Sequence, residues 1–370
     1  MRRRTTWMVP IAVVGLMLAA CGGGGGAGGD TTAAADTTCE LDQTDGNLNL
    51  YNWSDYIDPE LVTAFEEQYG VEVVESFYES NEAMLAQIQS GVSYDLIVPS
   101  DYMVSIMIEE ELLLPLQKDA IPNIANLAPE FTDPPYDPGL RYSVAYQWGT
   151  TGLGVNLEAV GDAFVESWAL VFDPELTQNF PGGVSLLDDP RETMGAALKY
   201  LGYSLNDTDL DHLAEARDVI RAAKPYIATF DSDQYDEALV NGEVSVSHGY
   251  SGDLLAAIWD AENPDAYTYV IPEEGGTLWV DNMAIPADAE HPCTAHTFVN
   301  FMLDGENGAA LTNWTYYASP NAAAEPHILP EILEDPTIYP SDEIRQRLEI
   351  IADTGDYEIN FTDYFAQAKS

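Results

Sequence analysis

Basic side chains are scarce in this sequence. Its 370 residues include 13 Lys and Arg against 63 Asp and Glu, which gives a formal net charge of −50. This balance argues against nucleic acid and against anionic lipid headgroups as partners, because both need a basic surface. Hydrophobic residues make up 46% and aromatic residues 11% of the chain, which is enough for a folded core rather than a disordered chain. The length fits about two domains of roughly 100–200 residues each.

Cysteine and histidine are scarce as well. Three cysteines are too few for a disulfide scaffold. Of the five histidines, His291 and His296 are only five residues apart, but no HExxH or cysteine-pair motif surrounds them. We therefore expect neither a metal site nor a cofactor.

The apolar run near the start of the chain is too short to cross a bilayer comfortably. It covers residues 7–20, follows three arginines and ends in small residues, as secretory signal peptides do. The sequence LAAC at residues 18–21 resembles the lipobox of bacterial lipoproteins. This resemblance implies removal of residues 1–20 as a signal peptide and lipidation of Cys21. An ordinary secretory signal with a chance cysteine is the alternative.

A glycine-rich stretch separates this segment from the rest of the chain. Residues 22–38 carry no large apolar side chain, so we expect residues 21–38 to be a flexible tether. A lipid at one end and a folded part at the other would hold the protein outside the cell membrane, in the periplasm or on the cell surface. That environment is oxidising, so Cys39 and Cys293 could form a disulfide; two separate thiols are the alternative.

The excess of carboxylates has two interpretations. So acidic a surface is typical of proteins from salt-loving organisms, in which salt screens the mutual repulsion. Alternatively, the charge attracts a cationic partner. We expect most carboxylates, Asp233 among them, to lie on a solvated surface, with only a few in a binding site.

The remaining sequence alternates strand and helix patterns. Between residues 48 and 113 three strand patterns alternate with three helix patterns, and residues 184–303 repeat this style. Such alternation predicts an α/β fold with mostly parallel sheets flanked by helices. We expect two lobes, joined near residues 146–151 and 274–278. Lobe 1 would comprise residues 39–150 with 279–320, and lobe 2 residues 151–278 with 321–370.

Carboxylates and aromatic rings follow the predicted strands, where open α/β sheets bind their ligands. Asn52-Trp53-Ser54-Asp55-Tyr56 follows the first strand, and Asp281 shares one face of a later strand with Trp279. An elongated cation suits this chemistry, because carboxylates bind ammonium groups and rings bind methylenes and cations.

Several motifs make the chain similar to a known family. It resembles the spermidine/putrescine-binding proteins of bacterial polyamine ABC transporters from residue 48 to near the C-terminus. The motifs that carry the resemblance are LYNWSDYI (50–57), ESNEAM (79–84), YDLIVPSDY (94–102), WGTTGLGVN (148–156), SLLDDPRE (185–192), WVDNMAIPADA (279–289) and YYASPNAAA (316–324). The resemblance implies a two-lobed periplasmic-binding-protein clamp.

The resemblance also implies a ligand site with aromatic and acidic walls. The matching positions are Trp53, Ser54, Tyr56, Ser100, Tyr102, Asp189, Glu192, Tyr250, Asp253, Trp279, Asp281 and Tyr317. Tyr250 stands where the family usually has Trp, and Asp253 matches an acidic position of the putrescine-preferring branch. A glutamine used by some members has no clear counterpart, since Ile351 lies about there. These departures leave the choice between diamines and triamines open.

Simpler structural roles compete with ligand binding at several of these positions. Asp189 and Glu192 also fit a capping box, and Asp253 could add charge to the first turn of the next helix. Trp53 and Trp279 could be core residues. Asp55 and Asp101 are better explained as caps or solvated charges than as ligands. Asp281 is the hardest to explain structurally, because a carboxylate inside an apolar strand is costly unless it is paired.

An enzyme is the alternative function. The pair Asp189 and Glu192 could serve a carbohydrate-acting enzyme, but no nucleophile elbow and no ordered dinucleotide motif is found. We therefore expect a monomeric, extracytoplasmic binding protein that closes on a polyamine by a hinge motion and delivers it to an ABC permease.

Overall fold

A computed structural model describes residues 38–370. The predicted signal peptide, the predicted lipidation site Cys21 and nearly all of the predicted tether lie outside the described residues. Within residues 38–370 no helix has both the length and the apolar composition that crossing a membrane requires.

The strands form one curled, mixed sheet of nine strands. Its order is β2-β1-β3-β9-β4-β7-β5-β6, and β8 pairs with β4. The strands are β1 (Leu48–Asn52), β2 (Val73–Phe77), β3 (Leu96–Ile97), β4 (Ser143–Asn156), β5 (Val184–Leu186), β6 (Ile227–Phe230), β7 (Val246–Tyr250), β8 (Tyr267–Val270) and β9 (Leu278–Ala284).

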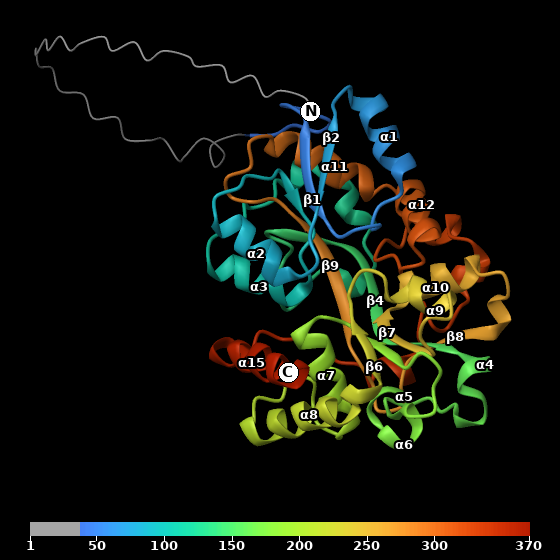
Figure 1. The fold of residues 1–370 in the computed structure, drawn as a ribbon. Helices are drawn as coiled ribbons and strands as arrows, with labels where there is room; N and C mark the ends of the chain where they lie inside the picture. Colours follow the sequence, from blue (N-terminus) through green and yellow to red (C-terminus); the bar gives the residue numbers. More distant parts are fainter. Residues whose placement is uncertain (1–37) are drawn as a thin grey trace, which may run out of the picture.

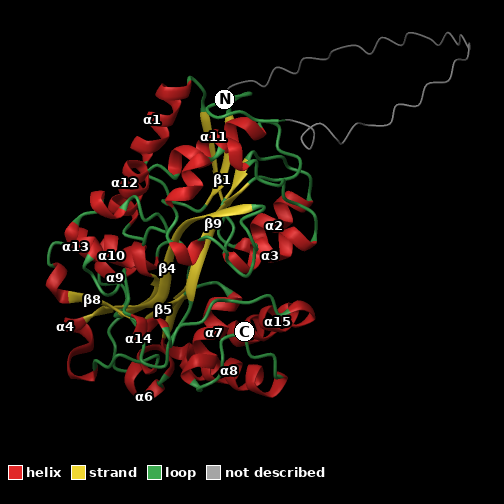
Figure 2. Cartoon of the chain, turned by 180° about the vertical axis from the view of Figure 1, so that it is seen from behind, coloured by secondary structure: helices red, strands yellow, loops and turns green. Residues whose placement is uncertain are grey.

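Strand β4 runs through both parts of the molecule. Residues Ser143 to Thr150 pair with β9, with a register shift between Ala145 and Gln147, and Thr151 to Asn156 pair with β7 and β8. Figures 1 and 2 show β4 and β9 descending together from the upper part, which contains β1 to β3, into the lower part, which contains β5 to β8. These two strands therefore link the two parts.

The α/β fold class is confirmed, but the sheet is less parallel than expected. Strands β2, β1 and β3 are parallel, as are β6, β5 and β7. Strands β4, β8 and β9 pair antiparallel with their neighbours. The sequence predicts residues 146–151 only as a link between the lobes and not as part of strand β4. The Gly- and Thr-rich sequence of β4 lacks the alternation of a half-buried strand.

Helices cover both faces of each part. In the upper part α1 and α12 lie on one side, and α2 and α3 lie on the other (Figures 1 and 2). In the lower part α15 packs on α7 and α8. The longer helices are α1 (Pro59–Tyr69), α2 (Asn81–Gln89), α3 (Asp101–Glu109), α7 (Pro190–Tyr200), α8 (Leu210–Ala223), α9 (Tyr235–Val240), α10 (Ser251–Asp260), α11 (Pro292–Met302), α12 (Gly305–Thr315) and α15 (Glu358–Lys369). Single-turn helices are α4 (Leu157–Val160), α5 (Ala169–Phe172), α6 (Pro174–Thr177), α13 (Pro330–Leu333) and α14 (Asp342–Arg345).

Local signals explain where the first helix begins and ends. The Asp58 side chain accepts a hydrogen bond from the Glu60 amide, and Pro59 occupies the first turn. Gly70 ends the helix in the left-handed conformation, with φ of 69°. Leu61 and Phe65 are buried, so this helix contributes an apolar face to the core of the upper part.

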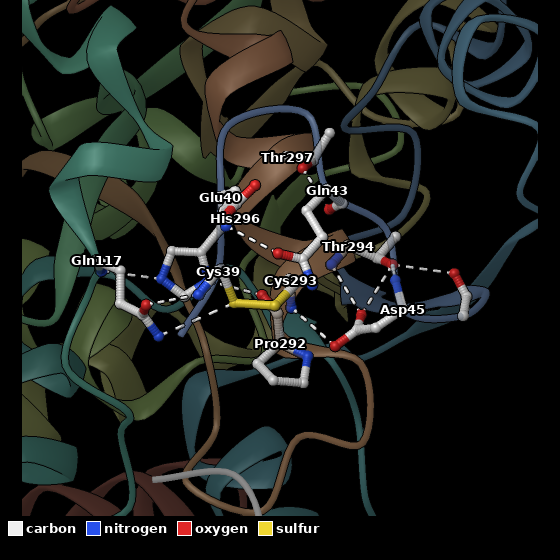
Figure 3. Close-up of a disulfide and its surroundings, with 11 residues drawn as sticks. Cys39, Glu40, Gln43, Asp45, Gln117, Pro292, Cys293, Thr294, His296 and Thr297 are labelled. Carbon is white, nitrogen blue, oxygen red and sulfur yellow. Dashed lines mark hydrogen bonds between the residues drawn. A yellow bond between two sulfur atoms is a disulfide. The ribbon is translucent and has the colours of Figure 1, made fainter. Parts of the chain in front are cut away.

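A disulfide ties the first described residues to α11 (Figure 3). Cys39 pairs with Cys293 across 254 residues, with a Cα–Cα distance of 5.1 Å. Gln117 Oε1 accepts a hydrogen bond from the Cys39 amide, and Asp45 accepts one from the Cys293 amide. The point at which the chain enters the fold is thus anchored covalently and by hydrogen bonds.

Several of the few basic side chains hold the C-terminal segment in place. Arg191 pairs with Glu358 at 2.5 Å, and Lys199 pairs with Glu349 at 2.7 Å. Lys369 at the chain end pairs with Asp188. In residues 38–370 only seven side-chain ion pairs form, two of them through histidine. Most carboxylates therefore have no cationic neighbour.

The uncompensated charge predicts that stability depends on salt. The Debye length falls from about 10 Å at 0.1 M to about 3 Å at 1 M salt, which screens repulsion between exposed carboxylates. We expect Tm to rise by at least about 5 °C between 0.1 M and 2 M KCl, which corresponds to roughly 3–4 kcal/mol for a chain of this size.

Scanning calorimetry with a sucrose control tests this expectation. Sucrose stabilises folded proteins by exclusion from their surface without screening charge. A Tm that does not change with KCl, or that rises equally in sucrose of matched osmolality, would contradict the role assigned to repulsion.

Candidate functional site

A cavity of about 490 Å³ lies where the two parts meet. Its lining comes from the ends of β1, β3 and β9 in the upper part and from α7, α9 and α10 in the lower part. The structure places all twelve residues of the predicted site in its wall: Trp53, Ser54, Tyr56, Ser100, Tyr102, Asp189, Glu192, Tyr250, Asp253, Trp279, Asp281 and Tyr317.

The lining is acidic and aromatic. It contains ten carboxylic acids: Asp55, Glu79, Asp101, Asp189, Glu192, Asp233, Asp236, Asp253, Asp260 and Asp281. Nine aromatic residues also line it: Trp53, Tyr56, Tyr78, Tyr102, Tyr250, Trp279, Trp314, Tyr316 and Tyr317. Among the described residues that line the cavity there is no Lys, Arg or His. The cavity therefore offers negative charge and ring faces with no positive group of its own.

Asp281 occupies the centre of this wall on β9. Its Oδ1 accepts a hydrogen bond of 2.6 Å from the Ser100 hydroxyl. Ser100 is held in turn by Asn81, which donates to its Oγ at 3.0 Å and accepts from its amide at 3.1 Å. Only 6% of Asp281 is exposed. Its carboxylate is therefore buried and oriented, and none of the described lining residues is a Lys, Arg or His that could balance it.

Burial governs the protonation of Asp281. Loss of hydration raises its pKa to about 7, against the lowering effect of the Ser100 hydrogen bond and of the nearby Tyr56 hydroxyl. A carboxyl group with this pKa is half protonated at neutral pH. A bound cation would favour its ionised form.

Aromatic rings surround Asp281. Trp279 meets Tyr317 edge to face at 5.1 Å and Tyr250 at 6.0 Å, geometries that aromatic pairs prefer. Gly149 lies opposite Trp279 in the β4–β9 register. A Cβ atom at Gly149 would come within 2.6 Å of the indole ring, so glycine at this position leaves room for Trp279.

Asp189 and Glu192 form an acidic group at the start of α7. Asp189 Oδ1 accepts from the amides of Arg191 and Glu192 at 2.8 and 3.0 Å and thus caps the helix. Glu192 does not complete a capping box. Its two carboxylate oxygens accept hydrogen bonds from Thr151 at 3.0 Å and Thr277 at 2.7 Å. Burial, and then the charge of Asp189, raise the pKa of Glu192 to about 8.

Asp253 on α10 is a third acidic residue in the cavity wall. Tyr235 donates to its Oδ2 at 2.5 Å, and Tyr317 donates to its Oδ1 at 2.7 Å. Burial raises the pKa of Asp253, the two phenol hydrogen bonds lower it, and the charge of Asp55 raises it further. Asp55 therefore faces the same end of the cavity.

The upper wall is fixed by contacts to the backbone and to α2. Trp53 donates from Nε1 to the Val98 carbonyl at 3.0 Å. The Tyr102 hydroxyl donates to Glu82 at 2.9 Å. Ile351, which stands near the position of the family glutamine, is buried and adds an apolar surface to the lining.

Three acidic residues near the cavity were expected to be solvated or structural. Asp55 and Asp233 are exposed, as expected for solvated charges, and both also lie at the cavity wall. Asp101 is buried and fits the structural interpretation, because it accepts hydrogen bonds from the amides of Tyr102 and Val280. Its buried carboxylate links α3 to β9.

Sequence analysis missed further acidic and aromatic lining residues. Asp236 lies on the short helix α9, and burial with the nearby charge of Asp253 raises its pKa to about 7. Asp260, Trp314 and Tyr316 come from the ends of α10 and α12. Asp260, Trp314 and Tyr316 lie at helix ends, where the rule that placed the other loops does not apply. Asp236 follows the end of β6, a signal that could have found it.

Comparisons with known proteins agree with this geometry. Residues 60–340 match the family described as bacterial extracellular solute-binding proteins. The chain is 40% identical over 312 residues to a putrescine/cadaverine-binding protein of Pseudomonas aeruginosa, covering 83% of this chain and 88% of the relative. It is 35% identical over 325 residues to a spermidine/putrescine-binding periplasmic protein of Escherichia coli, covering 87% and 91%.

A solved structure supports the same assignment. The spermidine/putrescine ABC transporter substrate-binding protein of Streptococcus pneumoniae superimposes with a TM-score of 0.73 at 35% identity, covering 88% of this chain and 99% of that one. These relatives are transport proteins, so the preference for a binding protein over a carbohydrate-acting enzyme is confirmed. The chain belongs to the family of bacterial extracellular solute-binding proteins, together with the polyamine-binding proteins of ABC transporters.

Proposed function

We propose that this protein captures a polyamine, putrescine or spermidine, outside the cytoplasm and delivers it to an ABC permease. The observation that carries the proposal is the lining of the cavity, where buried carboxylates and aromatic rings occur without a basic side chain. Ammonium groups supply the missing charge, and a methylene chain suits the ring faces. The names of the relatives support the same ligand class.

The carboxylates are placed to receive separate ammonium groups. Asp281 lies beside the aromatic rings, Asp253 lies towards Asp55, and Asp189 with Glu192 occupies the start of α7. In this proposal a ligand lies along Trp279, with its terminal ammonium groups near Asp253 and near Asp189 and Glu192. Asp281 contacts an ammonium between or beside them. The hydroxyl groups that hold these carboxylates pre-organise the site, which lowers the cost of ordering it on binding.

Closure of two lobes would complete the site. We propose lobe 1 as residues 39–150 with 279–320 and lobe 2 as residues 151–278 with 321–370. The cavity wall draws on both lobes, and β4 and β9 connect them. A hinge in these strands would let solvent and ligand enter and would exclude water on closure. The closed form would then dock on the permease as a monomer.

The role of Asp281 is tested by Asp281→Asn, which removes the charge and keeps the shape. A buried, charge-assisted hydrogen bond contributes about 1.5–3 kcal/mol, and about 1.4 kcal/mol is one decade in Kd. We expect calorimetric titration with putrescine at 1 M KCl to show affinity weakened by at least about tenfold. The variant should remain at least as stable as the wild type at pH 8, because burial disfavours the ionised Asp281 in the empty protein.

Asp265→Asn provides the matched control. Asp265 is exposed and does not line the cavity, and exposed charges contribute little at high salt. Its substitution should change affinity by less than about twofold. Equal losses in both variants would mean that the ligand condenses on a negative surface, and the specific site would have to be abandoned.

We also propose that Cys21 carries a lipid anchor. The motivation is the LAAC sequence at residues 18–21, followed by the glycine-rich residues 22–38. Cys21→Ser should move the protein from the membrane pellet to a soluble or unprocessed form, as fractionation of expressing cells would show. Normal processing with continued membrane attachment of that variant would rule out the anchor.

A further inference from the structure

Tyr235 lies behind the cavity wall. It is the first residue of α9, only 1% of it is exposed, and it is not part of the lining. Its hydroxyl donates to Asp253 Oδ2 at 2.5 Å and accepts from the Tyr250 amide at 3.3 Å. This single buried phenol therefore connects the Asp253 carboxylate to the backbone of a second lining residue.

The main chain leaves room for this ring. A Cβ atom at Gly249 would come within 2.0 Å of Tyr235 Cε2. Any larger residue at position 249 would displace the ring. Gly249 is in β7 and directly precedes Tyr250. The missing side chain at Gly249 thus leaves space for the Tyr235 ring against β7, and the next residue, Tyr250, lines the cavity.

Tyr317 completes the arrangement from the other side. Its hydroxyl donates to Asp253 Oδ1 at 2.7 Å, so each carboxylate oxygen receives one phenol hydrogen bond. Each oxygen has further acceptor capacity after one such bond. Two donors fix the plane of the carboxylate and favour its ionised form over its neutral form.

We propose that Tyr235 is a positioning residue for the ligand: with Tyr317 it holds Asp253 ionised and oriented so that the carboxylate receives a terminal ammonium group. This inference rests on the proposed polyamine-binding function. It assigns a role to a residue that does not touch the ligand. It also implies that the Asp253 end of the site favours a primary ammonium, since such a group can donate to both oxygens.

The groups around Asp253 affect its protonation, so the proposal can be tested through the dependence of binding on pH. Asp55 and Asp236 place further negative charge near it, and Tyr235, Tyr250 and Tyr317 are the phenols that face it. Both nearby carboxylates favour protonation of Asp253, and the phenol hydrogen bonds oppose it. Loss of one phenol should therefore shift protonation of Asp253 to higher pH.

Tyr235→Phe tests the proposal through the pH dependence of putrescine affinity. We expect the loss of affinity to be larger at pH 6, about tenfold, than at pH 8.5, about threefold or less, because losing a phenol donor raises the pKa of Asp253 and low pH favours its neutral form. In an Asp253→Asn background the same substitution should have little further effect, because the two residues act through one contact.

Tyr267→Phe is the matched control. Its hydroxyl, also in the lower part, donates to the Val240 carbonyl at 3.0 Å. This variant should change affinity by less than about twofold at both pH values. An equal loss at pH 6 and pH 8.5 for Tyr235→Phe, or a fully additive loss with Asp253→Asn, would overturn the positioning role. Wild-type protein that binds no polyamine would instead overturn the proposed function.

Discussion

The binding site depends on one physical constraint, which is that several carboxylates lie close together in a single cavity with little access to water. Asp281, Glu192 and Asp189 are buried and Asp253 is half-buried, and ionising several of them in one cavity is costly. Hydroxyl groups of Ser100, Thr151, Thr277, Tyr235 and Tyr317 donate to these carboxylates and reduce the cost. They cannot cancel the charge. Burial therefore favours the neutral forms of Asp281 and Glu192, and a polycation would favour their ionised forms.

The rest of the fold supports this arrangement. Strands β4 and β9 supply Gly149, Trp279 and Asp281 and also connect the upper and lower parts. The scarce cations are used elsewhere: Arg191, Lys199 and Lys369 fasten the C-terminal segment to α7 and its surroundings. Arg191 is the basic residue nearest in sequence to the site, yet its guanidinium faces Glu358 and Phe361 rather than the cavity. The cavity is thus left without a competing positive charge.

Sequence reasoning succeeded where a single local signal determines structure. Asp58-Pro59 and Gly70 set the ends of α1, and the apolar spacing over residues 210–223 set those of α8. The rule that ligands bind at strand ends pointed to Trp53, Trp279 and Asp281, and the family resemblance supplied twelve of the residues that line the cavity. Sequence reasoning failed for β4, whose burial depends on partners distant in sequence, and it did not single out Asp236, which lies on the short helix α9. The role of Tyr235 could not be identified from the sequence, because it depends on the packing of its ring against Gly249.

We expect ligand ammonium groups to replace protons on the buried carboxylates when a polyamine binds. Burial raises the pKa of Asp281 to about 7 and that of Glu192 to about 8, so both should lose protons when a polyamine binds at neutral pH. Calorimetric titration with putrescine in buffers of different ionisation enthalpy measures this release directly. We predict release of roughly 1.4 protons per ligand at pH 7 and less than about a third of a proton at pH 8.5. Binding without proton release at pH 7 would contradict the claim.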